Sequence, residues 1–156
     1  MPLKVWNGSS WVSSTGLKVW NGSSWASAVA GKVWNGSSWV QFFSSLAASL
    51  SPTSVSGSEQ RLGAGSKYVP ATPTVYVTAS GGVAPYTYLW EYVSGTAAGF
   101  NQTSSSSFMD FFRNMTVSVG EVKNEQGYYR CKVTDNAGTI VYTTTVLVET
   151  QLTETS

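Results

Sequence analysis

The sequence predicts an all-β chain in which tandem β-hairpin repeats are followed by a β-sandwich. The phrase KVWNGSSW occurs three times within residues 1–43. Aromatic residues make up 13% of the chain and charged residues only 11%, a balance that favours β-structure over solvated helices. Residues 73–149 divide into evenly spaced β-favouring runs separated by turn residues. We therefore expect hairpins over 1–43, a linker over 44–72, a sandwich over 73–149 and a flexible tail over 150–156.

Each repeat is predicted to form a β-hairpin. Asn-Gly is the strongest short hairpin signal because both residues tolerate positive φ, and β-favouring residues flank it here. In the first repeat, a four-residue loop over 7–10 would place Trp6 opposite Trp11 and Val5 opposite Val12. A two-residue turn would instead make the tryptophans diagonal neighbours. Either register puts both indoles on one face of the hairpin.

Tryptophans recur at a step of fourteen residues through the repeats, at Trp6, Trp11, Trp20, Trp25, Trp34 and Trp39. A segment of this length cannot close a core of its own, so the indoles need a partner surface. The hairpins could stack on each other, stack across copies of the chain, or dock on another protein. We expect these six tryptophans to make assembly contacts. The alternative is a carbohydrate platform, although the repeats contain no acidic residue to bind hydroxyl groups.

The middle and the end of the chain have weaker signals. Residues 44–72 are rich in Ser, Ala, Gly and Pro, which is typical of a linker. Phe43, Leu46 and Leu50 fall at helical spacing, so a short helix and a partly extended tether are both possible there. The final stretch, TQLTETS, is polar and is expected to be loose.

The run MTVSVGEVKNEQGYYRCKV, residues 115–133, resembles strand E, its turn and strand F of the immunoglobulin (Ig) fold. In that family a tyrosine two residues before the strand-F cysteine forms the tyrosine corner, and the resemblance assigns that role to Tyr129, before Cys131. Upstream, GGVAPYTYLW resembles strand C of the same family, with Trp90 as its core tryptophan. This stretch is also similar to PKD-like and bacterial Ig-like variants.

The same resemblance implies the neighbouring strands. The segment TVYVTASGG would be strand B, and Val77 stands where the family has its second cysteine. We therefore expect no inter-sheet disulfide and a buried free thiol at Cys131. Residues 139–148 are expected to form a single closing strand G with one common face, made of Ile140, Tyr142, Thr144, Val146 and Val148.

Composition argues against catalysis and against several partner classes. The chain has no histidine, its acidic residues are scattered, and it has no glycine-rich phosphate loop. We expect no enzyme activity, no cofactor and no metal site. A net charge of +1 does not favour nucleic-acid binding. No apolar run approaches the roughly 20 residues that span a bilayer, so we expect no membrane insertion.

Tandem KVWNGSSW units beside a disulfide-free Ig-like domain resemble structural proteins of tailed bacteriophages, of the tail-associated, fibre or head-decoration (capsid) type. This resemblance implies a virion protein that assembles in the bacterial host cytoplasm and attaches to other capsid or tail proteins through its repeats. It also implies an Ig-like domain that contacts host-surface glycans weakly. We expect a homo-oligomer, with a trimer as the favoured state. The alternative function is a bacterial cell-surface or carbohydrate-binding adhesion module.

Overall fold

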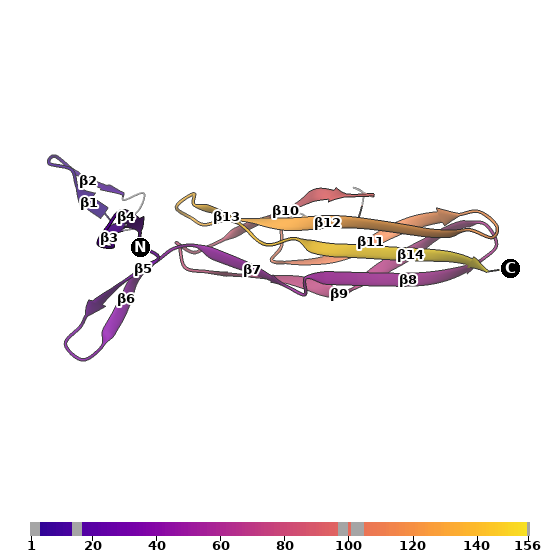
Figure 1. The fold of residues 1–156 in the computed structure, drawn as a ribbon, viewed down its shortest axis with the longest axis horizontal. Coiled ribbons are helices and arrows are strands. Elements are labelled where there is room, and N and C mark those ends of the chain that lie inside the picture. The colour runs from indigo at the N-terminus through magenta and orange to yellow at the C-terminus, as the bar shows by residue number, and fades with distance from the viewer. Residues whose placement is uncertain (1–3, 14–16, 97–99, 101–104, 156) are drawn as a thin grey trace.

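The structure is a computed structural model and describes residues 4–13, 17–96, 100 and 105–155. All regular elements in these residues are β-strands, which confirms the all-β class. Three hairpins lie at one end of the elongated chain, and a larger sheet makes up the rest (Figure 1).

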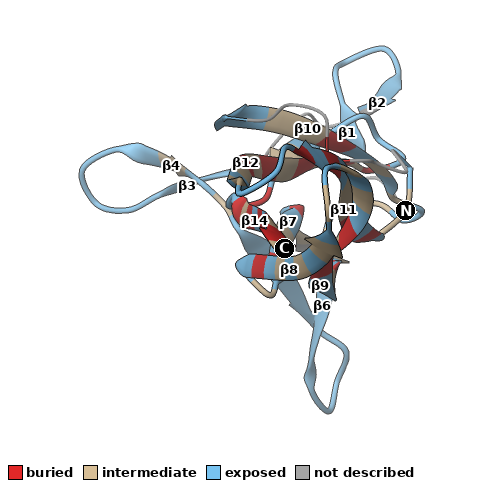
Figure 2. Cartoon of the chain, turned by 90° about the vertical axis from the view of Figure 1, so that its right-hand side faces the viewer, coloured by how far each residue is buried: buried red, intermediate tan, exposed pale blue. Residues whose placement is uncertain are grey.

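The hairpins are three separate two-stranded antiparallel sheets, β1–β2, β3–β4 and β5–β6. Their strands are β1 (Lys4–Trp6), β2 (Trp11–Ser13), β3 (Lys18–Trp20), β4 (Trp25–Ser27), β5 (Ala30–Trp34) and β6 (Trp39–Ser44). No strand of one hairpin pairs with a strand of another among the described residues. Viewed along the long axis, the hairpins extend in three different directions and are exposed throughout most of their length (Figure 2).

Eight strands form the larger sheet: β7 (Ala47–Ser51), β8 (Ser54–Leu62), β9 (Gly65–Ser80), β10 (Thr87–Gly95), β11 (Phe108–Val117), β12 (Val122–Thr134), β13 (Ile140–Tyr142) and β14 (Val146–Thr155). Their order is β10-β12-β14-β8-β9-β11, with β13 beside β12 and β7 beside β9. Only the β14–β8 pair is parallel. A single paired position, Ser56 with Thr72, joins β8 to β9.

That narrow junction lets the sheet fold over, so that β10, β12 and β14 face β9 and β11 across a core. Trp90 of β10 meets Phe111 of β11 edge to face, with ring centroids 5.8 Å apart. The Phe111 ring also packs on Tyr129 of β12, at 5.0 Å. A second, smaller cluster lies farther from the hairpins and contains Val69, Met115, Val117 and Leu152.

The prediction of a linker over residues 44–72 is wrong, because these residues form β7, β8 and the first half of β9. Leu46 and Leu50 are both buried. Positions four apart share a face of a strand as well as of a helix, so the spacing could not separate the two structures. β7 pairs with β9 over Ala47 to Ser51, and neither the helix nor the tether forms. The larger domain therefore begins near residue 46, not 73.

The expected flexible tail is also wrong. β14 continues to Thr155 and pairs with β12 on one side and β8 on the other. Its alternate residues Thr150, Leu152 and Glu154 are buried. Neighbouring strands satisfy both edges of this polar segment, and that pairing is not visible in its composition.

The prediction of a single strand G over residues 139–148 is wrong in part. It is interrupted between Tyr142 and Val146, and the expected common face changes side. Ile140 and Tyr142 are exposed, whereas Val146 and Val148 are fully buried. Thr143 turns inward at the break, where its hydroxyl accepts the Cys131 backbone N–H (3.0 Å) and donates to the Thr144 carbonyl (2.8 Å).

Candidate functional site

The hairpin turns are built by the Asn-Gly-Ser-Ser loop. Asn7 Oδ1 accepts the backbone N–H groups of Ser9 (3.0 Å) and Ser10 (2.9 Å). The Asn7 N–H donates to the Ser10 carbonyl (3.1 Å). Gly8 has φ of 101°, which a residue with a side chain rarely adopts. The other two repeats repeat this geometry, so the four-residue loop sets the register.

This loop places the two tryptophans of each repeat directly opposite one another. Trp6 pairs with Trp11, and Val5 pairs with Val12 on the other face. The Trp6 and Trp11 ring centroids lie 5.8 Å apart at an interplanar angle of 58°, and the pairs in the other hairpins have the same spacing. Tilted pairs of this kind stabilise a hairpin by roughly 0.5–1.5 kcal/mol beyond their area.

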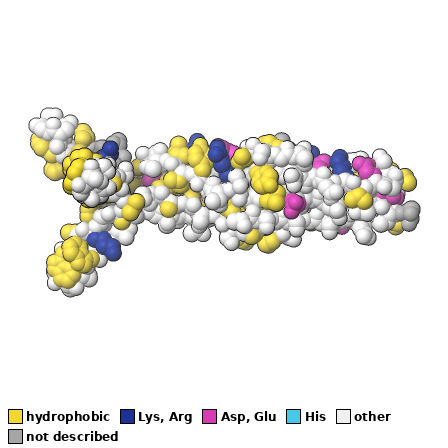
Figure 3. Space-filling model, in the orientation of Figure 1, with side chains coloured by type: hydrophobic (Ala, Val, Ile, Leu, Met, Phe, Trp, Pro, Cys, Tyr) yellow, Lys and Arg dark blue, Asp and Glu magenta, His cyan; other side chains and the backbone are white. Residues whose placement is uncertain are grey.

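Pairing leaves much of each indole available for contact. The six side chains keep between 52% and 66% of their surface exposed. Hydrophobic side chains gather on the hairpins with basic side chains beside them, while the acidic side chains lie on the larger sheet (Figure 3). Among the described residues the hairpins are three separate sheets and each tryptophan pair lies within one hairpin, so stacking between hairpins of the same chain is not seen there. Contact across copies of the chain and docking on another protein stay predictions.

A backbone hydrogen bond joins the third hairpin to the larger sheet, because Gly82 N–H donates to the Ser44 carbonyl (2.9 Å). Ser45 N–H donates to the Val29 carbonyl (2.8 Å) and closes the base of the hairpin itself. A Cβ on Gly81 would lie 2.0 Å from the Ser45 carbonyl oxygen, so only glycine permits this approach. The turn between β9 and β10 thus fixes where the hairpins leave the larger sheet.

Asp135 holds this turn in place from the β12–β13 connection. Its Oδ2 accepts the Val83 N–H (2.9 Å), and its Oδ1 accepts those of Ala137 (2.9 Å) and Thr139 (2.8 Å). Burial alone would raise the pKa of the carboxyl group, but these three bonds outweigh it and lower the pKa below its ordinary value of 3.8. The carboxylate is therefore a structural anion.

The four residues predicted for the larger core are brought together in one cluster: Val77, Trp90, Tyr129 and Cys131. Trp90 lies opposite Cys131 in the β10–β12 pairing. Its indole Nε1 donates to the Ser106 carbonyl (3.0 Å).

The tyrosine corner is not formed as expected. The Tyr129 hydroxyl accepts the backbone N–H of Phe100 (3.3 Å), which lies 29 residues upstream, after β10. A tyrosine corner joins the hydroxyl to the backbone a few residues upstream, near the start of the strand. Tyr129 instead lies in the middle of β12, where its fully buried ring packs on Phe100 and Phe111.

Cys131 is a free, buried thiol, which confirms the expectation for this residue. Burial raises its pKa to about 11, the backbone hydrogen bond with Leu89 lowers it partly, and the nearby Glu91 charge raises it. At neutral pH the group is a protonated thiol in the core, which does not suit a nucleophile.

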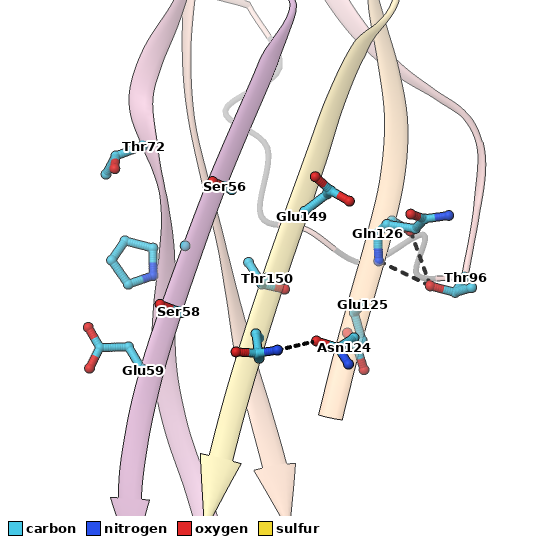
Figure 4. Close-up of a pocket in the computed structure, with 13 residues that line it drawn as sticks. Ser56, Ser58, Glu59, Thr72, Thr96, Asn124, Glu125, Gln126, Glu149 and Thr150 are labelled. Atoms are coloured by element: carbon cyan, nitrogen blue, oxygen red, sulfur yellow. Dashed lines mark hydrogen bonds between the residues drawn. The ribbon is translucent and has the colours of Figure 1, made fainter. Parts of the chain in front are cut away.

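Sequence reasoning missed a polar hollow on the outer face of β8, β14 and β12, with a volume of about 740 Å³ (Figure 4). Gln151 donates to Asn124 Oδ1 (2.9 Å), and the Gln126 N–H donates to the Thr96 hydroxyl (3.0 Å). The only sequence signal is the alternation of polar residues on these strands. No group of three or more His, Cys, Asp or Glu side chains suited to a metal ion occurs among the residues described.

Comparisons with protein-family models, with curated proteins and with solved structures gave no match. Within the described ranges, no helix is long and apolar enough to cross a membrane. The three exposed tryptophan pairs are the most prominent apolar surface of the described hairpins.

Proposed function

We propose that the chain is a non-enzymatic structural protein of a tailed-bacteriophage virion, assembled in the host cytoplasm. Its hairpins attach it to other virion proteins of the capsid or tail, and its larger domain projects from the particle. The observation that carries this proposal is the set of three identical, half-exposed tryptophan pairs at one end of the chain. Apolar surface of this kind is typical of a protein-protein contact.

We also propose that the larger domain is an Ig-like sandwich. In the Ig fold strands B and E share one sheet, while C, F and G share the other. The neighbouring pairs β9–β11 and β10–β12–β14 support this assignment. The pairing of Trp90 with Cys131 supports it further, because strands C and F are adjacent there. The chain departs from the family at Val77, where an apolar side chain replaces a disulfide cysteine.

Three weak contacts in one chain explain why the phrase is repeated. Once one hairpin is bound, the other two are held near their sites at a high effective concentration, so their affinities multiply. Because the hairpins extend in three directions, they can reach separate surfaces (Figure 2). Hairpins of neighbouring chains could also cover one another's indoles, which favours a homo-oligomer and a trimer in particular.

The test is incorporation into particles grown without the native protein. We would delete residues 18–31, a whole repeat, and separately replace Trp34 and Trp39 with serine. Each change should reduce incorporation by much more than a third, because it removes one contact from a multivalent set. A Val29→Ser variant is the control, since Val29 is an exposed apolar side chain outside the tryptophan pairs.

Normal incorporation of both the 18–31 deletion and the variant with serine at positions 34 and 39 would refute attachment by the hairpins. Loss of incorporation on deleting the larger domain alone would reverse the roles given to the two parts. Sedimentation of the purified full chain measures the oligomer: a monomer at all concentrations would refute the trimer without affecting attachment to a different virion protein.

A second candidate function is an adhesion module of a bacterial cell surface. The observation that favours it is an exposed aromatic face on β9 and β11 of the larger domain, which includes Tyr68, Tyr76 and Phe108. The neighbouring reading frames discriminate between the candidates: capsid and tail genes support the virion, whereas cell-wall or secretion genes support adhesion.

A further inference from the structure

The outer face of β9 and β11 carries two pairs of aromatic side chains. Tyr68 packs on Phe112 with ring centroids 4.8 Å apart, and Tyr76 packs on Phe108 at 6.3 Å. Tyr68, Tyr76 and Phe108 keep 51%, 59% and 45% of their surface exposed. We call these four residues the aromatic ladder.

The ladder is not part of the core. Side chains alternate along a strand, and the intervening residues Val69, Val75, Met109 and Phe111 are the buried ones. The core is therefore already filled from the opposite face of the same two strands. The two ring pairs stabilise the outer face of the sheet, but they also leave an apolar aromatic surface exposed, which is typical of a binding site.

Polar side chains lie between and beside the aromatic pairs. Asp110 is exposed on β11 between Phe108 and Phe112, and its Oδ1 accepts a hydrogen bond from the Thr74 hydroxyl. The exposed Asn114 lies opposite Tyr68. Aromatic rings pack on the apolar C–H faces of sugars, while a carboxylate accepts and an amide both accepts and donates hydrogen bonds to hydroxyl groups.

We infer that the aromatic ladder, with Asp110 and Asn114, is a binding site for neutral oligosaccharides. The charges of this face favour a neutral ligand. Arg113 turns inward to Glu125 (2.6 Å), and Lys67 pairs with Glu59 on β8 (2.9 Å). Among the described outward side chains of the ladder region, Asp110 is charged and no lysine or arginine accompanies it. An anionic glycan, phospholipid or nucleic acid would meet an uncompensated carboxylate there.

The spacing of the ladder also sets the length of the ligand. Phe108 and Phe112 are four residues apart on one strand, a span of about 13 Å. A ligand that contacts both pairs must be extended and several sugar units long. A disaccharide reaches one pair and should bind more weakly than a hexasaccharide of the same sugar.

This inference does not depend on attachment by the hairpins. It rests on the proposed projection of the larger domain from the particle, and it gives a site to the host-surface glycan contact that the bacteriophage resemblance implies. The hairpin tryptophans lack any nearby acid, whereas the ladder has both stacking rings and hydroxyl-binding groups. The polar hollow of Figure 4 has hydroxyl-binding groups but no aromatic lining residue. The ladder thus combines the two features that the other surfaces have singly.

The experiment applies the purified full chain to an array of neutral and acidic glycans, then titrates the best neutral hexasaccharide and its disaccharide. Tyr68→Ala and Tyr76→Ala should each weaken hexasaccharide binding by roughly 3- to 10-fold, since each removes one stacking ring. Tyr142→Ala is the matched control, because Tyr142 is a similarly exposed tyrosine on β13, which pairs with β12 and not with β9 or β11. Thermal melting of each variant checks that the fold is retained.

Three results would overturn the inference. The first is that the chain binds no neutral glycan. The second is that Tyr142→Ala weakens hexasaccharide binding as much as Tyr68→Ala and Tyr76→Ala do. The third is a concentration-dependent dimer that Tyr68→Ala abolishes without glycan binding, which would assign the face to a second copy. A variant with Trp34 and Trp39 replaced by serine should bind glycan normally, so failure of attachment and failure of this site are distinguishable.

Discussion

Replacing Glu154 with alanine should destabilise the larger domain, although this residue lies in a stretch whose composition predicts a loose tail. Its carboxylate accepts the backbone N–H of Gly63 at Oε1 (3.0 Å) and that of Gly120 at Oε2 (2.7 Å). Gly63 belongs to the β8–β9 turn and Gly120 to the β11–β12 turn. One side chain of β14 therefore fixes two turns at the end of the domain remote from the hairpins (Figure 1).

The magnitude follows from these two bonds. A hydrogen bond to a charged group contributes about 1.5–3 kcal/mol when buried. Gly120 is exposed, so water can replace part of its bond. We therefore expect Glu154→Ala to lower the free energy of unfolding by about 2–4 kcal/mol. Glu154→Gln should cost less, because one amide oxygen can still accept a bond.

Urea unfolding of the full chain, followed by far-ultraviolet circular dichroism, measures this effect. Glu149→Ala is the control, because Glu149 is exposed on the same strand. It should change the free energy by no more than about 0.5 kcal/mol. Equal urea midpoints for Glu154→Ala and Glu149→Ala would refute the structural role of Glu154. They would instead support the prediction that the end of the chain is loose.

Two further predictions concern the core and pH. Trp90→Ala should lower the free energy of unfolding by about 3–5 kcal/mol, because it leaves a cavity in the core. Trp90→Phe should lower it less, because it chiefly removes the hydrogen bond to the Ser106 carbonyl. Denaturant midpoints equal to that of the wild type would refute the burial of Trp90. Despite its burial, Asp135 has a lowered pKa in the folded chain, so its stabilisation is complete above the unfolded pKa near 3.8 and is lost as pH falls through the folded value. Thermal melts across this range should show a shallower acid dependence for Asp135→Asn, and an unchanged slope would contradict the assignment.

The sequence alone determined the hairpins and the identity of the central core. Asn-Gly and its flanking tryptophans are local signals, and a four-residue loop closes without help from the rest of the chain. Val77, Trp90, Tyr129 and Cys131 could be assigned to the interior because the segments that contain them resemble strands B, C and F of the Ig fold.

Only the tertiary structure decided the domain boundaries. β8 and the part of β14 after Val148 are mostly polar, and each is ordered by hydrogen bonding to its neighbours along the parallel β8–β14 ladder. A short stretch of sequence cannot reveal this pairing, because the paired residues Val55 and Val148 are far apart in the chain. Composition therefore predicts a linker and a tail where the fold has strands.

The exposed aromatic ladder also could not be predicted from the sequence. Phe111 and Phe112 are adjacent and equally apolar, and nothing local says which of them faces inward. The structure buries Phe111 against Trp90 and leaves Phe112 beside Tyr68 on the outer face. A strand with aromatic residues at consecutive positions has two candidate core faces, and the register with β9 chooses between them.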